Sequence, residues 1–243
     1  MLNDILIEAK NKLLNNGFAI IDAIYSTNEI NEIGTVISKL DTSNPIFRKS
    51  EHLFAIRQFI KEVPEIKNIL FNSQFKEVIN TIGGEDYFVV KSIYFDKPKK
   101  SNWFVSYHQD LTISVNEKKN LNDFINWTKK HNQYAVQPNK EILENIFTVR
   151  IHLDDTTAGN GALKVINKSH LKSINRIENT DFKLEEEVIC EVNSGGIMIM
   201  KPLLFHASSK TTNNKNRRVI HIEFSNKKLS ENIAWSEYST VFN

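Results

Sequence analysis

The stretch YFVVKSIYF, residues 87–95, marks the point at which the sequence changes from helical spacing to strand spacing. Aromatic and β-branched residues fill it, and such residues are typical of strands. The same character recurs further along the chain in short runs separated by Asn, Gly, Ser or Lys. These runs are VSYHQDLTISV (105–115), IFTVRIHL (146–153), GALKVI (161–166), VICEV (188–192), GIMIM (196–200) and RVIHIEF (218–224). Together they favour a mainly β fold with a closed or double-sheet architecture.

Residues 1–86 instead predict helices mixed with short strands. Ser26 and Glu29 have the spacing of a capping box ahead of an apolar helical stripe. Pro64 suits the first turn of a further helix, and SQFKEVINTIGG (73–84) is typical of a helix that ends at its two glycines. An N-terminal helix is indicated by one apolar face, made of Leu2, Ile5, Leu6, Ala9 and Leu13. We expect these helices to brace the β-rich part.

The chain contains no repeat, low-complexity tract or Pro/Gly-rich linker, which predicts a single domain over residues 1–243. Within it we expect a helical and mixed part (1–86) and a β core (87–225). Residues 116–145 interrupt the core with a stretch that is too long and polar for a hairpin. Insertions of that kind often form lids or binding loops, so this one is predicted to cover a site.

Composition narrows the function classes. Lys and Arg number 31 against 29 Asp and Glu, and this net charge of +2 gives no electrostatic reason to expect a nucleic-acid partner. The cluster Lys97, Lys99 and Lys100 indicates a solvated loop. No apolar run approaches the roughly 18 residues that span a bilayer, and the N-terminus does not resemble a signal peptide. We therefore expect a soluble, cytoplasmic protein with a small-molecule substrate and no nucleic-acid or membrane partner; the oligomeric state stays open.

Cys190 is the only cysteine, and its strand-like setting predicts a buried structural thiol. Metal chemistry therefore has to use histidine and carboxylate. In a strand, residues two apart point to the same face, so His108 and Asp110 can offer two ligands to one ion, on a face continued by Thr112 and Ser114. A non-haem iron(II) site needs two neutral imidazoles and one carboxylate, which leaves a third ligand to be found.

His206 is the best candidate for that ligand, because GIMIMKPLLFHAS runs a strand into a Pro-containing turn, and a ligand at a strand end faces a pocket. The other histidines fit less well. His152 indicates a structural histidine on the same strand face as Arg150, His170 a turn residue, and His221 a position too far inside the last strand. His52 and His131 have a polar, helix-like context that is typical of the surface.

Arg217 and Arg218 follow His206 by eleven and twelve residues and begin the strand RRVIHIEF. A loop that returns the chain antiparallel would bring one of them near the metal, where its planar fork can hold a carboxylate. Strand alternation does not choose between them, since Arg217 shares a face with Val219 and His221 and Arg218 with Ile220 and Ile222.

In this order, the segments GFAIIDAIYSTNEI (17–30), YHQDLTISV (107–115), VRIHLDDTTAGNGALKVINKSHL (149–171), GGIMIMKPLLFHASSK (195–210) and RRVIHIEF (217–224) resemble the phytanoyl-CoA dioxygenase family. The resemblance covers roughly residues 15–225. It implies a mainly β fold with flanking helices around a double-stranded β-helix (jelly roll, cupin-like), with Fe(II), 2-oxoglutarate and O2 as cofactor and co-substrates. One departure is Lys168, where the family commonly has glycine in a turn.

The resemblance implies a role for each matching residue. His108, Asp110 and His206 correspond to the metal-binding triad, and Arg217 to the residue that grips the far carboxylate of 2-oxoglutarate. Ser208 and Gln109 match positions that often help to bind the co-substrate, and Lys91 and Trp127 are weaker candidates for the same role. Because Asp110 is present, the chain lacks the Gly or Ala typical of the halogenase variant, which favours hydroxylation.

Two alternatives stay open at this point. Barrels of this class also host metalloenzymes that use a non-redox metal or work without 2-oxoglutarate, and relatives that only bind ligands. The sequence does not name the prime substrate; a small polar metabolite or natural-product intermediate is expected rather than an acyl-CoA, because no distinct basic cluster suits a nucleotide phosphate.

Overall fold

A computed structural model describes residues 2–41, 48–50, 53–130, 133–179, 186–230 and 232–242. Within these residues the strands form three antiparallel sheets. The large sheet has the order β1 (Phe18–Ile21), β12 (Ile197–Met200), β9 (Phe147–His152), β14 (Arg217–Ser225), β4 (Phe88–Lys97), β3 (Leu53–Arg57) and β2 (Arg48–Ser50). The four-stranded sheet has the order β11 (Glu187–Cys190), β10 (Leu163–Ile166), β13 (His206–Ser208) and β5 (Val105–His108). The small sheet has the order β6 (Ile113–Val115), β8 (Gln133–Gln137) and β7 (Ile125–Lys130).

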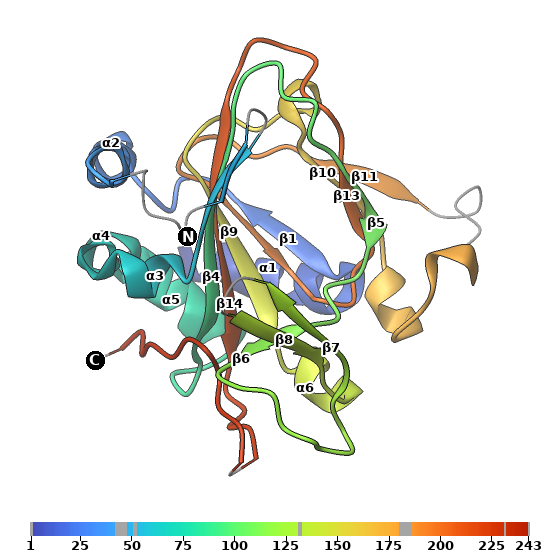
Figure 1. The fold of residues 1–243 in the computed structure, drawn as a ribbon. Coiled ribbons are helices and arrows are strands. Elements are labelled where there is room, and N and C mark those ends of the chain that lie inside the picture. Colours follow the sequence, from blue (N-terminus) through green and yellow to red (C-terminus); the bar gives the residue numbers. More distant parts are fainter. Residues whose placement is uncertain are drawn as a thin grey trace.

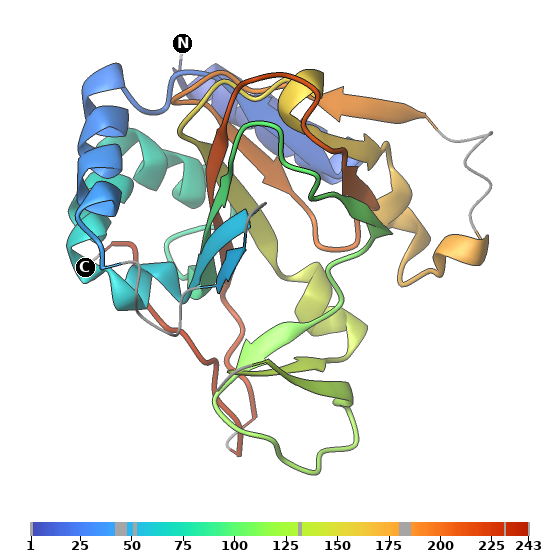
Figure 2. The ribbon, with the colours of Figure 1, turned by 45° about the horizontal axis from the view of Figure 1, so that its top comes forward.

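The large sheet stands between a layer of helices and the four-stranded sheet, as Figures 1 and 2 show from two directions. The helices on its outer side are α2 (Thr27–Ser38), α3 (Phe59–Glu62), α4 (Lys67–Leu70) and α5 (Ser73–Ile82), with α1 (Leu2–Asn16) beside β1. The fold is therefore mainly β with flanking helices and cupin-like, as the sequence predicted.

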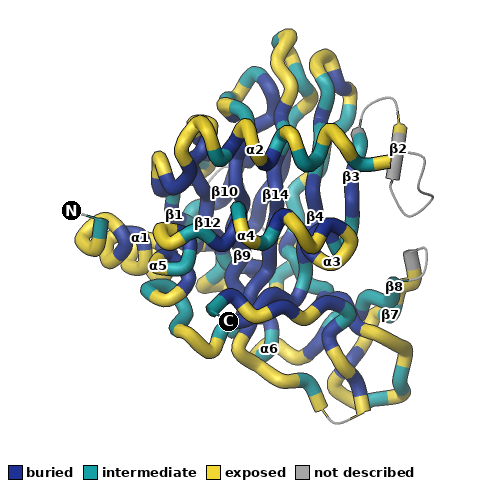
Figure 3. Tube along the Cα trace, turned by 90° about the vertical axis from the view of Figure 1, so that its left-hand side faces the viewer, coloured by how far each residue is buried: buried dark blue, intermediate teal, exposed yellow. Residues whose placement is uncertain are grey.

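Strand alternation gives the large sheet two different faces. From β9 and β14, the side chains of Phe147, Val149, Ile151, Ile220, Ile222 and Phe224 join the main core under the helices. Burying each such side chain contributes roughly 1.5–3 kcal/mol, so this core holds the helical layer in place. Figure 3 shows the buried central strands behind helices whose outer faces are exposed. The alternate, more polar residues of the same two strands face the space between the sheets.

The N-terminal helices largely follow the sequence. Leu6, Ala9 and Leu13 of α1 are buried, but Ile5 is 49% exposed, so its assignment to the apolar face was wrong. Ser26 caps α2 in a complete capping box with Glu29. Pro64 opens a 3-10 turn (Pro64–Ile66) that leads into α4, and α5 ends at Gly83, both as predicted.

The insertion at residues 116–145 contains the hairpin that the sequence argued against. β7 pairs with β8 with a register shift between Ile125 and Thr128, β8 pairs with β6, and α6 (Lys140–Glu144) follows. Together they form a lobe at the lower end of the molecule in Figures 1 and 2. Val136 and Leu143 pack with Ile113 and Val115 of β6 in a cluster that continues to Phe88 and Val90 of β4. The apolar residues spread among the polar ones are enough to make a hairpin stable once a third strand pairs with it.

Lys97 corrects a second expectation, because it is fully buried while Lys99 and Lys100 are exposed. β4 continues to Lys97, and the Lys97 ammonium donates to the carbonyl oxygen of Ser209 at 2.6 Å. Cys190 is buried, as expected.

The backbone conformation at Lys168 explains why glycine is common at this position in the family that the sequence resembles. Its φ of 63° lies in the left-handed region, where an L-residue with a Cβ is strained.

None of the helices in the described part of the chain combines the length and the apolar character needed to span a bilayer.

Candidate metal centre

Two histidines face each other across a strand pair inside the molecule. His108 is the last residue of β5 and His206 the first of β13, and the antiparallel register places them directly opposite. Their ring centroids are 4.2 Å apart. His206 therefore lies at a strand end, as predicted, and the pairing of two distant segments brings the two imidazoles together.

Asp110 reaches the same point by a different route from the one predicted. β5 ends at His108, so strand alternation does not carry Asp110, Thr112 and Ser114 on one face; Thr112 borders the cavity described below, and Ser114 belongs to β6 of another sheet. The backbone N–H of Asp110 instead donates to the carbonyl of Pro202 at 2.9 Å. This bond ties the turn after β5 to the turn before β13. Asp110 Oδ1 then lies 3.6 Å from His108 Nε2, and Oδ2 lies 3.6 Å from His206 Nε2.

The three side chains fit a divalent metal. His108 Nδ1 lies 2.9 Å from the Ser106 carbonyl and His206 Nδ1 lies 2.9 Å from the Leu204 carbonyl. Because a carbonyl only accepts, both Nδ1 atoms carry the proton and both Nε2 lone pairs point at the common centre. Asp110 Oδ2 is buried without a hydrogen-bond partner. The three ligand atoms lie within 4.8 Å of one another, and an octahedral ion bonded at about 2.1 Å would need neighbouring ligands about 3 Å apart, so a small contraction completes the site.

Local electrostatics also suit a cation. Burial raises the pKa of Asp110, but the surrounding His206, His108, Lys91 and His221 outweigh it, and the pKa of this carboxyl falls well below its usual range. Burial lowers the pKa of His206 to about 4, so this imidazole is neutral at pH 7. The centre therefore offers an ionised carboxylate and an unprotonated imidazole, the forms that bind metal ions.

A cavity of about 370 Å³ opens beside this centre, between the two main sheets. Its volume lies in the range of small-molecule sites. It is lined by Arg57, Lys91, Ile93, Phe95, Trp103, Val105, His108, Asp110, Thr112, Arg150, Leu163, His206, Ala207, Ser208, Arg217 and His221. None of these residues comes from 116–145, the segment predicted to be a lid, whereas the predicted residues Lys91, Ser208 and Arg217 are all present.

The structure separates the two arginines that alternation left equivalent. Arg217 is 3% exposed and lies on the cavity face with His221. Its Nη1 donates to the Gly161 carbonyl, and its Nε is buried without a partner. Arg218 points to the outer side and forms a two-pronged ion pair with Asp154, with Nε at 2.9 Å and Nη2 at 2.6 Å from the carboxylate oxygens. Of these two arginines, Arg217 is the one placed to hold an anion in the cavity.

Ser208 and Lys91 also border the cavity, but only Lys91 already has a partner for its polar group. Ser208 is 4% exposed, and its hydroxyl has no hydrogen-bond partner. Lys91 is ion-paired with Glu223 at 2.6 Å. Ser208 thus has a free hydrogen-bonding group for a ligand, whereas the charge of Lys91 is already matched.

The sequence matches the family described as Phytanoyl-CoA dioxygenase (PhyH) over residues 13–219, a range that includes His108, Asp110, His206 and Arg217. The chain belongs to the phytanoyl-CoA dioxygenase family. This family depends on iron(II) and 2-oxoglutarate. No curated protein matches the chain in sequence.

Solved structures with the same fold include proteins that bind or depend on 2-oxoglutarate. SnoK, a non-heme α-ketoglutarate-dependent carbocyclase from nogalamycin biosynthesis, superposes with a TM-score of 0.67 at 15% identity, covering 90% of this chain and 83% of its own. HygX from Streptomyces hygroscopicus, with nickel, 2-oxoglutarate and hygromycin B bound, gives 0.66 at 13% identity, covering 90% and 86%. EctD from S. alaskensis, with 2-oxoglutarate and 5-hydroxyectoine, gives 0.66 at 13%, covering 90% and 75%. At these identities the likeness establishes the fold that the family shares.

Two residues that the family resemblance suggested for the co-substrate are placed elsewhere. The Gln109 amide donates to the carbonyls of Ser173 at 2.8 Å and Leu203 at 2.7 Å and accepts from the N–H of Asn175 at 3.0 Å. Trp127 packs against the core of the small lobe, and its indole N–H donates to the Phe124 carbonyl. Neither borders the cavity. Gln109 is held away from the cavity by its bonds to neighbouring turns, and Trp127 belongs to the hairpin in the insertion.

Of the remaining histidines, the structure describes three: His152 and His170 are placed as predicted, and His221 is not. His152 is buried with Nδ1 2.7 Å from the Thr156 hydroxyl, and His170 lies in a 3-10 turn (Ser169–Lys172) with Nε2 3.1 Å from the Leu14 carbonyl. His52 and His131 lie outside the described residues. His221, expected to be too deep in its strand, borders the cavity and lies within 4.8 Å of Asp110. The prediction failed because the strand passes directly behind the metal centre.

Arg150 is a residue of this site that sequence reasoning passed over. It lines the cavity at 7% exposure, and the sequence gave it no role beyond sharing a face with His152. The available signal was the alternation of Thr148, Arg150 and His152 with apolar residues along a fully buried strand. Three polar residues on one face of such a strand indicate a polar interior rather than a second core.

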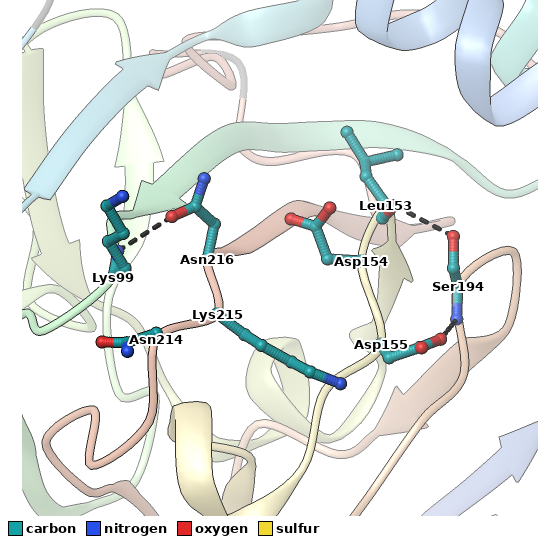
Figure 4. A pocket seen from close by; sticks show the side chains of 8 residues that line it. All are labelled: Lys99, Leu153, Asp154, Asp155, Ser194, Asn214, Lys215 and Asn216. Atoms are coloured by element: carbon teal, nitrogen blue, oxygen red, sulfur yellow. Dashed lines mark hydrogen bonds between the residues drawn. The ribbon is translucent and has the colours of Figure 1, made fainter.

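A more open hollow of about 600 Å³ lies apart from this cavity. It is lined by Lys99, Leu153, Asp154, Asp155, Ser194, Asn214, Lys215 and Asn216, which Figure 4 shows. Several of these groups bond to one another: Ser194 N–H donates to Asp155 at 2.9 Å, Ser194 Oγ to the Leu153 carbonyl, and Lys99 N–H to Asn216. Its polar groups hold loops together, so the histidine cavity remains the candidate site.

Proposed function

We propose that the protein is an Fe(II)/2-oxoglutarate-dependent dioxygenase that hydroxylates a small polar metabolite or natural-product intermediate. One observation carries the proposal: two imidazole Nε2 atoms and an unpartnered carboxylate oxygen converge in the same cavity as the unpartnered groups of Arg217 and Ser208. A metalloenzyme without a 2-oxoacid has no use for the second half of this arrangement.

The residues divide the work between metal and co-substrate. His108, Asp110 and His206 would hold iron(II) from one side and leave positions for the co-substrate and oxygen. Arg217 would pair with the far carboxylate of 2-oxoglutarate, and the Ser208 hydroxyl would donate to the same group. When bound, iron with 2-oxoglutarate and O2 supplies the oxidation, in which a substrate C–H becomes C–OH while the co-substrate gives succinate and CO2.

Two observations support a small-molecule substrate. Among the proteins of similar fold, SnoK belongs to the biosynthesis of nogalamycin, HygX was solved with hygromycin B, and EctD was solved with 5-hydroxyectoine. All three compounds are small molecules. The cavity of about 370 Å³ has room for a small ligand beside a co-substrate. A small-molecule substrate, with no nucleic-acid or membrane partner, is part of the proposal.

Anaerobic titration of the iron(II)-loaded protein with 2-oxoglutarate tests the metal and co-substrate roles. We expect the weak visible charge-transfer band of the chelate, a large loss of affinity in the Arg217→Met variant and parent-like affinity in the matched Arg218→Met variant. Absence of the band in the folded, iron-loaded parent would favour a metalloenzyme that does not use 2-oxoglutarate. A metabolite screen coupled to succinate release, followed by mass spectrometry for a gain of one oxygen atom, then tests hydroxylation.

A further inference from the structure

Arg150 occupies the middle of β9, opposite His221 of β14. Its Nη1 lies 3.1 Å from His221 Nδ1, and His221 Nε2 lies 3.1 Å from Glu223 Oε1. A guanidinium only donates, so His221 accepts at Nδ1 and carries its proton at Nε2, toward Glu223. Glu223 in turn is paired with Lys91. This chain of bonds fixes the orientation of Arg150 and uses one of its two terminal nitrogens.

The other edge of the Arg150 guanidinium is open. Nε is buried without a partner, and the residues that the structure describes place no carboxylate within 4.0 Å of this arginine. Arg217 has the same arrangement, with Nη1 bonded to a carbonyl and Nε unpartnered. Arg218 shows what fills such an edge in this protein, since its Nε and Nη2 hold the two oxygens of Asp154. Arg150 and Arg217 thus present two empty carboxylate-binding edges.

Both arginines line the same cavity. The charge of Arg150, after burial, lowers the pKa of Arg217, so the two guanidinium groups lie within each other's field. Burial raises the pKa of Cys190 to about 12, and Arg150 opposes that shift. Cys190 lies in the cross-strand row that continues through Leu163 to Ser208. The fields of Asp110, Cys190 and Arg217 thus all reach Arg150, and the same cavity is lined by Arg150, Arg217 and Ser208.

A second metal ion does not explain this cluster. Asp110, His221 and Glu223 also lie within 4.8 Å of one another. However, the Lys91 ammonium is 2.6 Å from Glu223, and His221 Nδ1 faces a guanidinium, so a cation placed here would meet two positive charges. His152 does not supply a donor either: the Thr156 hydroxyl donates to the Asp154 carbonyl and so accepts from His152 Nδ1, which leaves an Nε2 lone pair. Among the described residues that line the cavity, the buried donor groups without a partner belong to Arg150, Arg217 and Ser208.

We propose that Arg150 is a second anchor for the co-substrate, sharing the far carboxylate of the 2-oxoacid with Arg217 and Ser208. The inference rests on the proposed function. Two buried guanidinium charges without counter-ions are costly, and a carboxylate with four acceptor sites satisfies both edges at once. The protein would therefore select a 2-oxoacid with a carboxylate at its far end more strongly than one arginine allows.

Calorimetric titration of the Mn(II)-loaded protein with two ligands tests this assignment without turnover. 2-Oxoglutarate has the far carboxylate, and 2-oxopentanoate has the same carbon chain without it. We expect Arg150→Met to weaken 2-oxoglutarate binding by about tenfold or more, as loss of a charge-assisted pair does, and to leave 2-oxopentanoate binding within about twofold of the parent. Arg217→Met should behave alike, the double variant should lose less than the product of the two losses, and Arg218→Met should match the parent.

Three outcomes would overturn the assignment. Equal losses for the two ligands in Arg150→Met would place Arg150 at the metal-bound end of the co-substrate. Unchanged binding of both would assign Arg150 to another ligand. Multiplicative losses in the double variant would mean that the two arginines do not share one carboxylate. If Arg150→Met does not fold by circular dichroism, Arg150→Lys, which keeps the charge but not the planar fork, should show the same selective loss. Failure of the folded parent to bind 2-oxoglutarate would instead refute the proposed function.

Discussion

Replacing Gln109 by leucine should destabilise the protein and loosen its metal centre. The side chain is 7% exposed and makes hydrogen bonds of 2.8, 2.7 and 3.0 Å to backbone groups of Ser173, Leu203 and Asn175. A net contribution of about 1 kcal/mol each gives roughly 3 kcal/mol, and leaving the backbone partners unsatisfied in the interior raises the loss toward about 5 kcal/mol. This is a large part of the 5–15 kcal/mol that typically separates folded from unfolded domains.

Gln109 also lies between two metal ligands in sequence and bonds to Leu203, in the turn that leads to His206. Loss of that connection should weaken Mn(II) affinity about tenfold, as loss of groups that orient ligands commonly does. Urea unfolding measures the first effect and metal titration the second. Gln137→Leu is the matched control, because this half-buried glutamine accepts one exposed bond from Asn126 and should change stability by less than about 0.5 kcal/mol. A Gln109→Leu loss below about 1 kcal/mol, with unchanged Mn(II) affinity, would refute the reasoning.

Adding Mn(II) at about 100 times its dissociation constant should stabilise the parent protein by about 2.7 kcal/mol and raise its melting temperature. The His206→Ala variant should show no such rise. Equal rises in both proteins would contradict the metal centre. Burial lowers the pKa of Lys97 in the folded state to about 7 from 10.5, so above pH 7 the unfolded chain binds the extra proton and stability should rise toward pH 10, by up to about 1.4 kcal/mol per pH unit. Urea unfolding at several pH values should show a flatter dependence in Lys97→Met, and an identical slope would show that folding does not lower the pKa of Lys97. Lys168→Gly should raise the free energy of unfolding by up to about 1 kcal/mol by relieving the left-handed φ of 63°, and a loss of stability would show that the lysine side chain contributes more than the strain costs.

Local patterns in the sequence determined the elements and the type of chemistry. The change to strand spacing at residue 87, the capping box at Ser26 and the β-rich runs depend on interactions between near neighbours, and the structure has these elements. The sequence predicted that His108, Asp110 and His206 meet, and they do, although the strand ends at His108 and a backbone bond to Pro202 places Asp110. A spacing of two residues is compatible both with a continuous strand and with a turn. The predicted residues were therefore right, although the local structure expected to bring them together was wrong.

Only the tertiary structure decided which side of each strand became the site. Alternation places Arg217 and Arg218 on opposite faces, but the helices packed against one face of β14 determine which arginine is turned inward. The same packing turns Arg150 into the cavity and leaves Gln109 to hold the turns around it. The direction of each side chain along a strand depends on neighbouring residues. The layer that covers each face of the strand depends instead on segments far apart in the chain. For that reason the sequence alone did not reveal which face would line the site.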